Sequence, residues 1–164
     1  MRDLHPRTDR GLSLTWYARP ATDERPVLVT GVFDLMHVGH VRFLTAARDA
    51  GGALVVGVED DERVRAWKGP QRPVVPDRER AEVLAALKAV DGVFLVHGEP
   101  DVNSADAYAK LLAPLRPAVL AYTQGDRFTE QRRAGAEEMG AKPYEIPFVA
   151  GRSTSLLLQR LGAG

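Results

Sequence analysis

The fold is decided by the stretch Val27-Leu-Val-Thr-Gly-Val-Phe-Asp-Leu-Met-His-Val-Gly-His40, in which a short β-branched run precedes a glycine and two histidines. Residues 27–30 predict a buried parallel strand, and the apolar spacing over residues 38–44 predicts a helix directly after it. Backbone N–H groups at such a strand-to-helix turn bind phosphate, together with the helix dipole. We therefore expect a phosphate-binding loop around Gly31, at the carboxyl end of this strand.

The same alternation of short strands and amphipathic helices continues along the chain. Further buried strands are predicted at residues 53–58, 93–96, 118–122 and 144–146. Helices are predicted from residue 38 up to Gly51-Gly52, from a cap at Asp77, from a cap at Ser104, over residues 129–139, and from Ser153 through Leu161. Five strands that alternate with helices predict an α/β fold with a Rossmann-like, doubly wound, five-stranded parallel sheet. Ligands bind such sheets at the carboxyl ends of the strands.

The length and composition fit one globular domain. The chain has 164 residues, of which 45% are hydrophobic and 27% charged, and these values are ordinary for a domain with a sizeable core. Residues 1–25 are polar with isolated aromatics, so we predict a flexible N-terminal extension, or alternatively an arm that faces a partner. Residues 26–164 are assigned to the domain itself.

Charge balance and residue usage exclude several functional classes. The 22 basic and 22 acidic side chains cancel, whereas proteins that follow a nucleic-acid backbone carry a basic excess. The absence of cysteine excludes disulfides, thiolate metal sites and cysteine nucleophiles. No apolar run is long enough for a membrane span or a signal core. We expect a cytoplasmic protein with no nucleic-acid partner and no membrane partner.

Two imidazoles at the start of the predicted first helix are the candidate catalytic groups. His37 and His40 lie three residues apart and share one helix face, and Gly39 leaves space between them. Imidazoles placed in this way can stabilise the charge that develops on a phosphate during an in-line displacement. A chance surface pair or a zinc site is the alternative, but zinc needs further ligands and the chain holds four histidines and no cysteine.

The string from Gly31 to His40 resembles the signature of the cytidylyltransferase-like nucleotidyltransferases, the HxGH type of this fold. The adenylyltransferase domain of ADP-heptose synthase and glycerol-3-phosphate cytidylyltransferase are most similar, and the resemblance covers residues 27–161. It implies that His37 and His40 contact the nucleotide phosphates and stabilise the transition state. The nucleotide-binding residues implied in this loop are Thr30, Gly31, Val32, Phe33 and Gly39, and Asp34 is expected to contact the acceptor.

A second motif begins with Lys68-Gly-Pro-Gln-Arg-Pro-Val and enters the next predicted helix. It is similar to the lysine-glycine-x-x-arginine-proline-valine stretch of the heptose-phosphate adenylyltransferases, which implies that Lys68 is a catalytic cation for phosphate. The resemblance also implies that Asp61, Arg72 and Arg80 help to bind the acceptor. A lysine on a mobile loop is a compact cation, and an arginine on a helix is a rigid fork for phosphate. Solvated surface charge is the alternative.

Two further stretches complete the predicted nucleotide site. Gly151-Arg-Ser-Thr-Ser155 resembles the family's serine-threonine-threonine motif, which implies that Arg152, Ser153, Thr154 and Ser155 hold the outer phosphates. Capping of the last helix is a compatible alternative. Gln124-Gly125-Asp126 matches the family's loop near the base and ribose, so Gly125 and Asp126 are expected to bind the nucleotide. A turn aspartate is the alternative for Asp126.

The combined prediction is a nucleotidyltransferase that transfers AMP or CMP from a nucleoside triphosphate to a sugar or polyol phosphate and releases pyrophosphate. It is most like D-glycero-β-D-manno-heptose 1-phosphate adenylyltransferase. Mg²⁺ is the expected cofactor, because it bridges the triphosphate and offsets the charge of the leaving group. No side chain is assigned as a metal ligand. The resemblance also implies a homodimer.

Several alternatives stay open at this point. The enzyme could instead resemble glycerol-3-phosphate cytidylyltransferase, or the chain could be a non-catalytic nucleotide sensor. A fragment related to class I aminoacyl-tRNA synthetases is set aside, because no lysine-rich second signature and no basic excess accompany the histidine motif. The chain departs from the heptose-phosphate pattern at Glu59 and at Thr123, and both departures are expected to make the pocket less positive.

Overall fold

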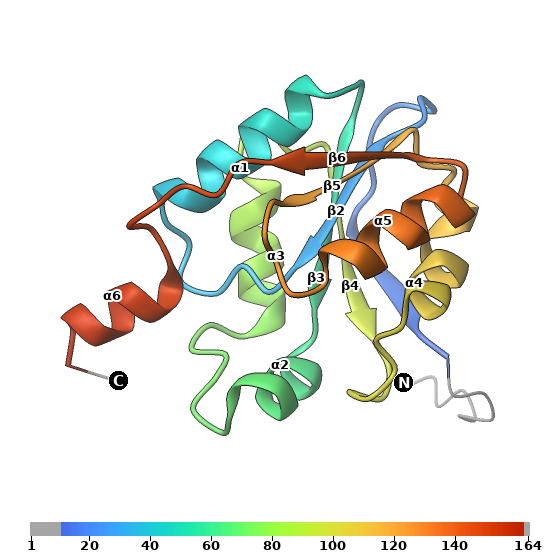
Figure 1. Ribbon diagram of the computed structural model, residues 1–164. Coiled ribbons are helices and arrows are strands. Elements are labelled where there is room, and N and C mark those ends of the chain that lie inside the picture. The colour runs from blue at the N-terminus through green and yellow to red at the C-terminus, as the bar shows by residue number, and fades with distance from the viewer. Residues whose placement is uncertain (1–10, 163–164) are drawn as a thin grey trace.

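The computed structural model describes residues 11–162 and places one mostly parallel sheet between two layers of helices (Figure 1). The strands are β1 (Ser13–Ala18), β2 (Val27–Gly31), β3 (Leu54–Glu59), β4 (Gly92–His97), β5 (Val119–Thr123) and β6 (Lys142–Ile146). The helices are α1 (Val38–Asp49), α2 (Asp61–Lys68), α3 (Asp77–Ala85), α4 (Ala105–Leu112), the short 3-10 helix η1 (Ala113–Leu115), α5 (Thr129–Glu138) and α6 (Thr154–Arg160). The sheet order is β1-β4-β3-β2-β5-β6. The predicted α/β fold and its five parallel strands are confirmed.

The sixth strand corrects the prediction of a flexible extension. β1 pairs antiparallel with β4, and Trp16 lies opposite Phe94 with the two rings 5.6 Å apart in an edge-on contact. Leu14 and Trp16 pack on the sheet, while the alternate residues Ser13, Thr15 and Tyr17 are exposed, as expected for an edge strand with one buried face. This alternation of exposed and half-buried residues covers only the six residues of β1, so it could not be recognised as a strand within a polar segment. Residues 1–10 of the predicted extension lie outside the described residues.

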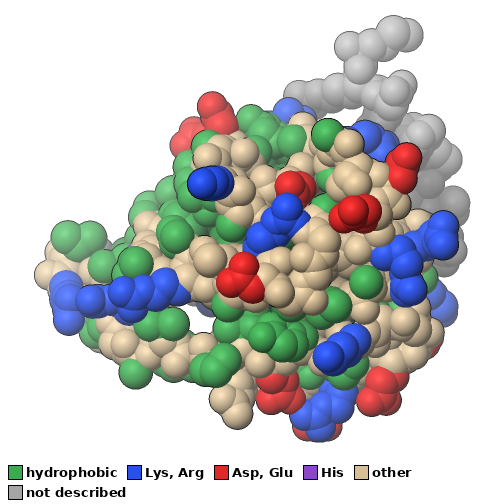
Figure 2. Space-filling view, turned by 90° about the horizontal axis from the view of Figure 1, so that it is seen from above, with side chains coloured by type: hydrophobic (Ala, Val, Ile, Leu, Met, Phe, Trp, Pro, Cys, Tyr) green, Lys and Arg blue, Asp and Glu red, His purple; other side chains and the backbone are tan. Residues whose placement is uncertain are grey.

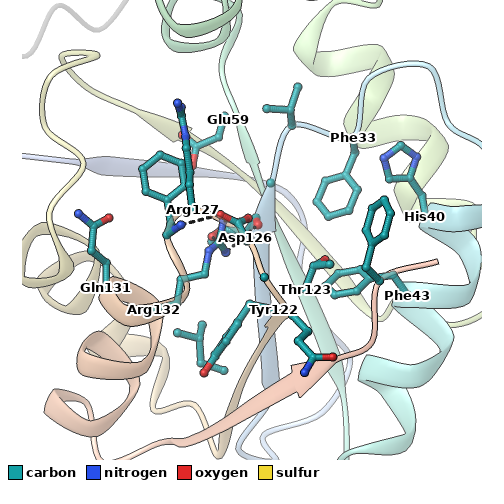
Figure 3. Close-up of a pocket in the computed structure, with 18 of the residues that line it drawn as sticks. Phe33, His40, Phe43, Glu59, Tyr122, Thr123, Asp126, Arg127, Gln131 and Arg132 are labelled. Carbon is teal, nitrogen blue, oxygen red and sulfur yellow. Dashed lines mark hydrogen bonds and ion pairs between the residues drawn. The ribbon is translucent and has the colours of Figure 1, made fainter. Parts of the chain in front are cut away.

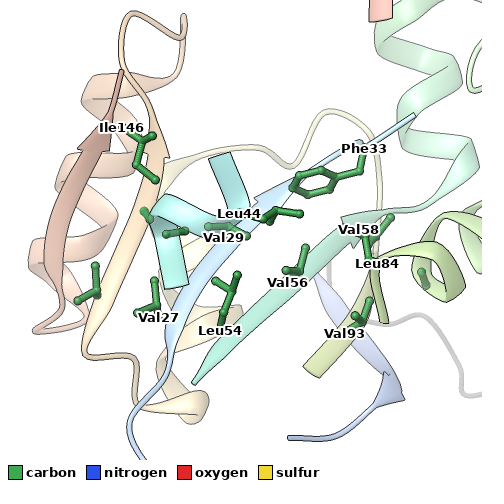
Figure 4. Close-up of a cluster of buried hydrophobic side chains, with 14 of the residues drawn as sticks. Val27, Val29, Phe33, Leu44, Leu54, Val56, Val58, Leu84, Val93 and Ile146 are labelled. Carbon is green, nitrogen blue, oxygen red and sulfur yellow. The ribbon is translucent and has the colours of Figure 1, made fainter. Parts of the chain in front are cut away.

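Two hydrophobic cores hold the helices against the sheet. Because side chains alternate along a strand, β2 sends Val27 and Val29 to one core and Leu28 to the other. The first core joins the sheet to α1 and α3 through residues such as Leu44 and Leu84 (Figure 4). The second core joins the opposite face to α4 and α5. The carboxyl ends of the strands are therefore flanked by α1 on one face and by α5 on the other.

The helix starts differ from the prediction in two places. α2 was not predicted, and it begins after Asp60, whose carboxylate accepts a hydrogen bond from the Arg63 N–H at 2.9 Å. α3 begins at Asp77 itself, so Asp77 does not cap it, and its carboxylate accepts from the Asp61 N–H at 3.3 Å instead. The predicted cap at Ser104 is confirmed, since its hydroxyl accepts from the Ala107 N–H at 3.2 Å.

The chain reverses its winding direction between β2 and β5. β2 pairs with β3 along its whole length, but its ladder with β5 covers only Val27 opposite Val119 and Leu28 opposite Leu120. The two strands therefore separate toward their carboxyl ends, and we call this opening the β2–β5 split. Open α/β sheets bind their ligands at such a reversal point.

The outer surface carries mixed charge on the face that Figure 2 presents. Basic and acidic side chains are interspersed there, and hydrophobic side chains lie between them. Within residues 11–162, no helix has both the length and the apolar character that crossing a bilayer requires.

Candidate active site

A cavity of about 880 Å³ opens at the β2–β5 split. This volume is typical of a small-molecule site. Figure 3 shows His40 and Phe43 on the α1 side of β2, and Arg132 on the α5 side. The predicted site residues that line the cavity are Thr30, Gly31, Val32, Phe33, Asp34, His37, Gly39, His40, Lys68, Arg72, Gly125, Asp126, Arg152, Ser153 and Thr154.

The turn between β2 and α1 has a constrained backbone. Phe33 and Leu35 have φ angles of 53° and 47°, a left-handed conformation that costs non-glycine residues about 1–3 kcal/mol each. This conformation turns the side chain of Asp34 inward, where the residue is 1% exposed. The contacts of Asp34 then offset the strain.

The Asp34 carboxylate anchors the loop between α2 and α3. It accepts hydrogen bonds from the N–H groups of Val74 and Val75 at 2.9 and 3.0 Å, and from Arg72 Nε at 2.7 Å. Burial alone would raise the pKa of Asp34, but these donors lower it overall. The hydroxyl of Thr154 donates to the Asp34 carbonyl at 2.7 Å. Asp34 therefore positions two walls of the cavity, and its contact with the acceptor stays a prediction.

The two histidines of α1 cap the start of their own helix. His37 Nδ1 accepts from the Gly39 N–H at 3.1 Å, and His40 Nδ1 accepts from the His37 N–H at 3.3 Å. Since each Nδ1 is an acceptor, the proton of each neutral ring lies on Nε2. The ring centroids are 3.9 Å apart. The pair therefore has two neighbouring Nε2–H groups left to donate to a ligand.

Gly39 is required by this close arrangement. A Cβ at residue 39 would lie 2.8 Å from His37 Cε1 and 3.0 Å from the Cβ of Arg152. Real Cβ atoms do not approach other atoms so closely, so any side chain here would displace the imidazole. The space that Gly39 was predicted to leave is thus occupied by the His37 ring.

Burial keeps both imidazoles neutral. Desolvation, and to a smaller extent the neighbouring His37, lower the pKa of His40 to about 4, although Asp34 opposes the shift. Desolvation and the charge of Arg152 lower the pKa of His37. At neutral pH the free protein therefore offers hydrogen-bond donors without net charge, and a bound phosphate would raise both pKa values.

We expect His40 to remain neutral across the range in which an ordinary histidine titrates. Its pKa of about 4 lies well below the usual 6.5, because charging a buried imidazole beside His37 is unfavourable. Long-range ¹H–¹⁵N NMR spectra of the free protein, recorded between about pH 5 and pH 8, should show His40 as the Nε2–H tautomer throughout. The spectrum of a His40→Asn variant would assign the signal, and a midpoint near 6.5 would contradict the geometry.

Lys68 reaches the cavity from the end of α2. The prediction of a mobile loop is thus corrected, because Lys68 is the last residue of a helix. Desolvation lowers the pKa of Lys68, and the charges of Arg72 and Arg127 lower it further. The carboxylates of Asp34 and Asp126 act in the opposite direction. Lys68 itself is exposed and lines the cavity, so α2 places a cation at the edge of the cavity.

Three predicted site residues do not line the cavity. Arg80 is 1% exposed, and its guanidinium pairs with Asp61 at 2.7 Å. Its remaining bonds go to the carbonyl oxygens of Val32, Glu59 and Val75. Arg80 and Asp61 are therefore a structural pair beneath the site, which departs from their predicted contact with the acceptor. Ser155 is exposed on α6, outside the cavity lining.

Glu59 belongs to a compensated network in the cavity wall. It is 4% exposed and accepts hydrogen bonds from Arg63 Nε at 2.7 Å and from the Tyr108 hydroxyl at 2.5 Å. Burial raises the pKa of Glu59 although both partners favour its charge. Arg63 also donates to the carbonyl oxygens of Glu99 and Val102. The expected loss of positive character at Glu59 is thus cancelled by Arg63, a partner that sequence reasoning did not assign.

The hydroxyl and aspartate motifs have internal partners. Ser153 caps α6 by accepting from the Leu156 N–H at 3.1 Å. Asp126 accepts from the Phe128 N–H at 2.7 Å, the bond of a turn aspartate. The capping and turn roles are therefore present, and phosphate or ribose contacts by these residues stay predictions.

Sequence reasoning missed the cationic side chains of the segment around the start of α5. Arg127 and Arg132 both line the cavity, and Arg132 also contacts Thr30 at the end of β2. In a sequence containing Arg132-Arg133, either residue is expected to be solvated surface charge. Only the position of α5 beside the β2–β5 split distinguishes Arg127 and Arg132 from arginines on the solvated surface.

Within residues 11–162, no group of three or more histidine, aspartate or glutamate side chains could hold a metal ion. The acidic side chains that line the cavity are Asp34, Glu59 and Asp126, and each already accepts hydrogen bonds from the protein. A resident metal centre built from protein ligands therefore does not fit these residues.

Comparisons with known proteins agree with this geometry. A family model described as cytidylyltransferase-like matches residues 28–121. The bifunctional protein HldE of Methylobacillus flagellatus is 41% identical over 85% of this chain and 28% of its own length. HldE of Geotalea uraniireducens is 37% identical over 90% of this chain and 29% of its own length. The chain thus spans less than a third of these curated relatives.

Solved structures share the fold at lower identity. A lipopolysaccharide core biosynthesis protein from Thermoplasma volcanium superposes with a TM-score of 0.60 at 24% identity, covering 76% of this chain and 96% of that one. A pantothenate synthetase from Thermus thermophilus has a TM-score of 0.56 at 18% identity, covering 78% of this chain and 57% of that one. These likenesses concern the arrangement of the sheet and its helices.

Proposed function

Because this chain belongs to the cytidylyltransferase-like family and is a nucleotidyltransferase, we propose that it joins the nucleotidyl group of ATP or CTP to a sugar or polyol phosphate. ATP with D-glycero-β-D-manno-heptose 1-phosphate is the leading substrate pair. The relatives named HldE and the resemblance to the ADP-heptose synthase adenylyltransferase domain favour this pair over the alternatives. The observation that carries the proposal is the pair of Nε2–H donors beside the β2–β5 split.

The reaction requires that the two substrates be positioned and that the charge developing on the phosphate oxygens be stabilised. An oxygen of the acceptor phosphate attacks the α-phosphorus, the bond from that phosphorus to the bridging oxygen breaks, and pyrophosphate leaves with the electron pair. The acceptor oxygen is already ionised near neutral pH, so no general base is needed. His37 and His40 donate hydrogen bonds to the phosphate oxygens on which charge develops, and Lys68 adds a cation. Because the two rings are fixed by the helix cap, little reorganisation is needed at the moment of reaction.

Mg²⁺ would arrive with the nucleotide. It binds through phosphate oxygens and waters together with one or two carboxylates, and Asp126 is the partly exposed carboxylate of the cavity, with 29% of its side chain accessible. Magnesium would supply charge neutralisation on the triphosphate. His37, His40 and Lys68 would bind the phosphates that carry the magnesium ion.

A non-catalytic nucleotide sensor is the second candidate, supported by the departures from the family pattern at Glu59 and Thr123. The pairing of Glu59 with Arg63 argues against the sensor, because it compensates the acid and leaves the charges of the cationic side chains in the cavity lining available.

A homodimer remains our prediction, and sedimentation velocity would test it.

Pyrophosphate release tests the proposal directly. The protein is incubated with Mg²⁺ and each of ATP, CTP, GTP and UTP, against heptose 1-phosphate, glycerol 3-phosphate, phosphoethanolamine, phosphopantetheine and FMN. We expect release that requires ATP and heptose 1-phosphate together. Release with CTP and glycerol 3-phosphate would replace the substrate pair. Nucleotide binding without release from any pair would support the sensor instead.

Lys68→Ala is expected to reduce kcat/KM by about 10- to 100-fold, because a charge-assisted contact to phosphate is lost. Lys68→Arg should recover part of the loss, since it restores the charge but not the compact shape. Steady-state kinetics in both substrates would measure the effect. The matched control is Lys88→Ala, which changes an exposed lysine outside the cavity lining. A rate equal to that of the unchanged protein at limiting substrate would remove Lys68 from the mechanism.

A further inference from the structure

We propose that Arg132 binds the phosphate group of the acceptor and holds it on the α5 side of the β2–β5 split. This inference rests on the proposed function. It assigns to Arg132 the acceptor-binding role that the sequence analysis expected of Arg80.

The guanidinium of Arg132 occupies the gap that β5 leaves beside β2. Its Nη1 donates to the carbonyl and hydroxyl oxygens of Thr30, at 3.2 and 3.3 Å. The ladder between the two strands ends two residues earlier, at Leu28. The side chain is thus fixed at the end of the strand that leads into the phosphate-binding loop.

Arg132 is partly buried, with 22% of its side chain exposed, and lacks the close carboxylate partner that the buried arginines have. Arg63 and Arg80 each have a carboxylate at 2.7 Å. The carboxylate of Asp126 lies 3.8 Å from Arg132 Nη2, and the buried Nε of Arg132 has no hydrogen-bond partner among the described residues. A guanidinium with an unmade hydrogen bond and a distant counter-ion is incompletely compensated. An anionic ligand would supply both missing interactions.

The position of Arg132 across β2 from the histidines suits an in-line reaction. Because side chains alternate along a strand, the side chain of Thr30 lies on the same face of β2 as Leu28, toward α4 and α5. His37 caps α1 and His40 lies in its first turn, and Figure 3 shows His40 on the opposite side of β2 from Arg132. In an in-line displacement the attacking and leaving oxygens lie on opposite sides of the phosphorus. A phosphorus held near Gly31 would meet the acceptor from the α5 side and release pyrophosphate toward the histidines.

The surroundings of Arg132 leave its charge available. Glu59 is a buried acid whose pKa the charge of Arg132 helps to lower. Glu59 is already engaged by Arg63 and Tyr108, so it does not neutralise Arg132. The planar fork of an arginine matches two oxygens of a phosphomonoester. The acceptor class that fits is therefore a small phosphomonoester whose remaining groups face the wall around Tyr108.

The test compares Arg132→Gln, Arg132→Lys and the matched control Arg133→Gln. Arg133 lies next to Arg132 on α5, pairs with Glu145 and does not line the cavity. For the acceptor found in the pyrophosphate assay, we expect Arg132→Gln to raise KM by about 10- to 100-fold while the Kd for Mg²⁺-ATP changes by less than about twofold. Arg132→Lys should recover part of the affinity, and Arg133→Gln should behave like the unchanged protein. Thermal melts would show that each variant is folded.

The outcomes separate this inference from the proposed function. An unchanged acceptor KM in folded Arg132→Gln would overturn the role of Arg132 and leave the transferase reaction intact. An equal loss of affinity for ATP and acceptor would also overturn it, since Arg132 would then serve the nucleotide. If the unchanged protein turns over no pair, calorimetry with inorganic phosphate and bound ATP takes over. Weaker phosphate binding by Arg132→Gln than by Arg133→Gln would support the site, and equal binding would refute it.

Discussion

Replacement of His40 by alanine is expected to lower kcat for pyrophosphate release by about 100- to 1,000-fold. The alanine removes the Nε2–H that would stabilise charge on the phosphate oxygens, and it also removes the Nδ1 acceptor that caps α1 through the His37 N–H. Steady-state rates at saturating substrate measure the first effect, and thermal melting measures the second. The KM for the acceptor should change little, because His40 lies on the other side of β2 from the proposed acceptor site.

Asparagine and glutamine separate the two roles of His40. The Oδ1 of asparagine can take the place of Nδ1 as the capping acceptor, but asparagine has no donor at the position of Nε2. His40→Asn should therefore melt close to the unchanged protein and be about as inactive as His40→Ala. The amide of glutamine reaches further and should retain part of the activity. A near-normal kcat in His40→Asn would exclude the Nε2–H from the mechanism.

Loss of Arg63 is expected to give the largest change in stability. Arg63→Met should lower the free energy of unfolding by about 3–5 kcal/mol, because it leaves the buried carboxylate of Glu59 without its cation. The carbonyl oxygens of Glu99 and Val102 would lose a donor as well. Urea denaturation at pH 7 would measure the loss. Arg65→Met is the matched control, since Arg65 is exposed on the same helix.

The effect of Arg63→Met should depend on pH in a defined direction. The pKa of Glu59 is already raised in the folded protein, and removal of Arg63 raises it further. The folded variant then binds a proton that the unfolded chain has released, so its stability falls as the pH rises above the ordinary glutamate pKa. We expect the gap between Arg63→Met and Arg65→Met to be larger at pH 7 than at pH 5. A gap that is independent of pH would mean that Glu59 does not carry the effect.

Features with local causes could be predicted from the sequence. The strand, turn and helix over residues 27–49 follow from neighbouring residues, and so does the pairing of His37 with His40 at a helix start. The caps at Ser104 and Ser153 are equally local. For the same reason the family motifs gathered most of the predicted residues around one cavity.

Features that depend on distant partners could not be predicted. β1 exists because Leu14 and Trp16 find the free edge and face of β4, which lies about eighty residues later in the chain. Arg80 and Arg132 have the same chemistry, but Arg80 lies beneath the sheet end with Asp61 while Arg132 reaches into the cavity. Which of the two arginines lines the cavity is decided by how α3 and α5 pack, and no local sequence pattern indicates this packing.

The contacts of Asp34 bear on the motions that admit and release substrates. Asp34 ties the loop between α2 and α3 to the start of α6, so these two walls are displaced together. Gln124 is bonded to β6, since its N–H donates to the Ile146 carbonyl at 2.8 Å, whereas residues 125–128 make local contacts: Asp126 bonds to the Phe128 N–H, and Arg127 stacks on Phe128. Opening of the cavity is therefore easiest at this segment. If departure of products limits turnover, substitution of Phe128 will alter kcat without touching the bond-making step.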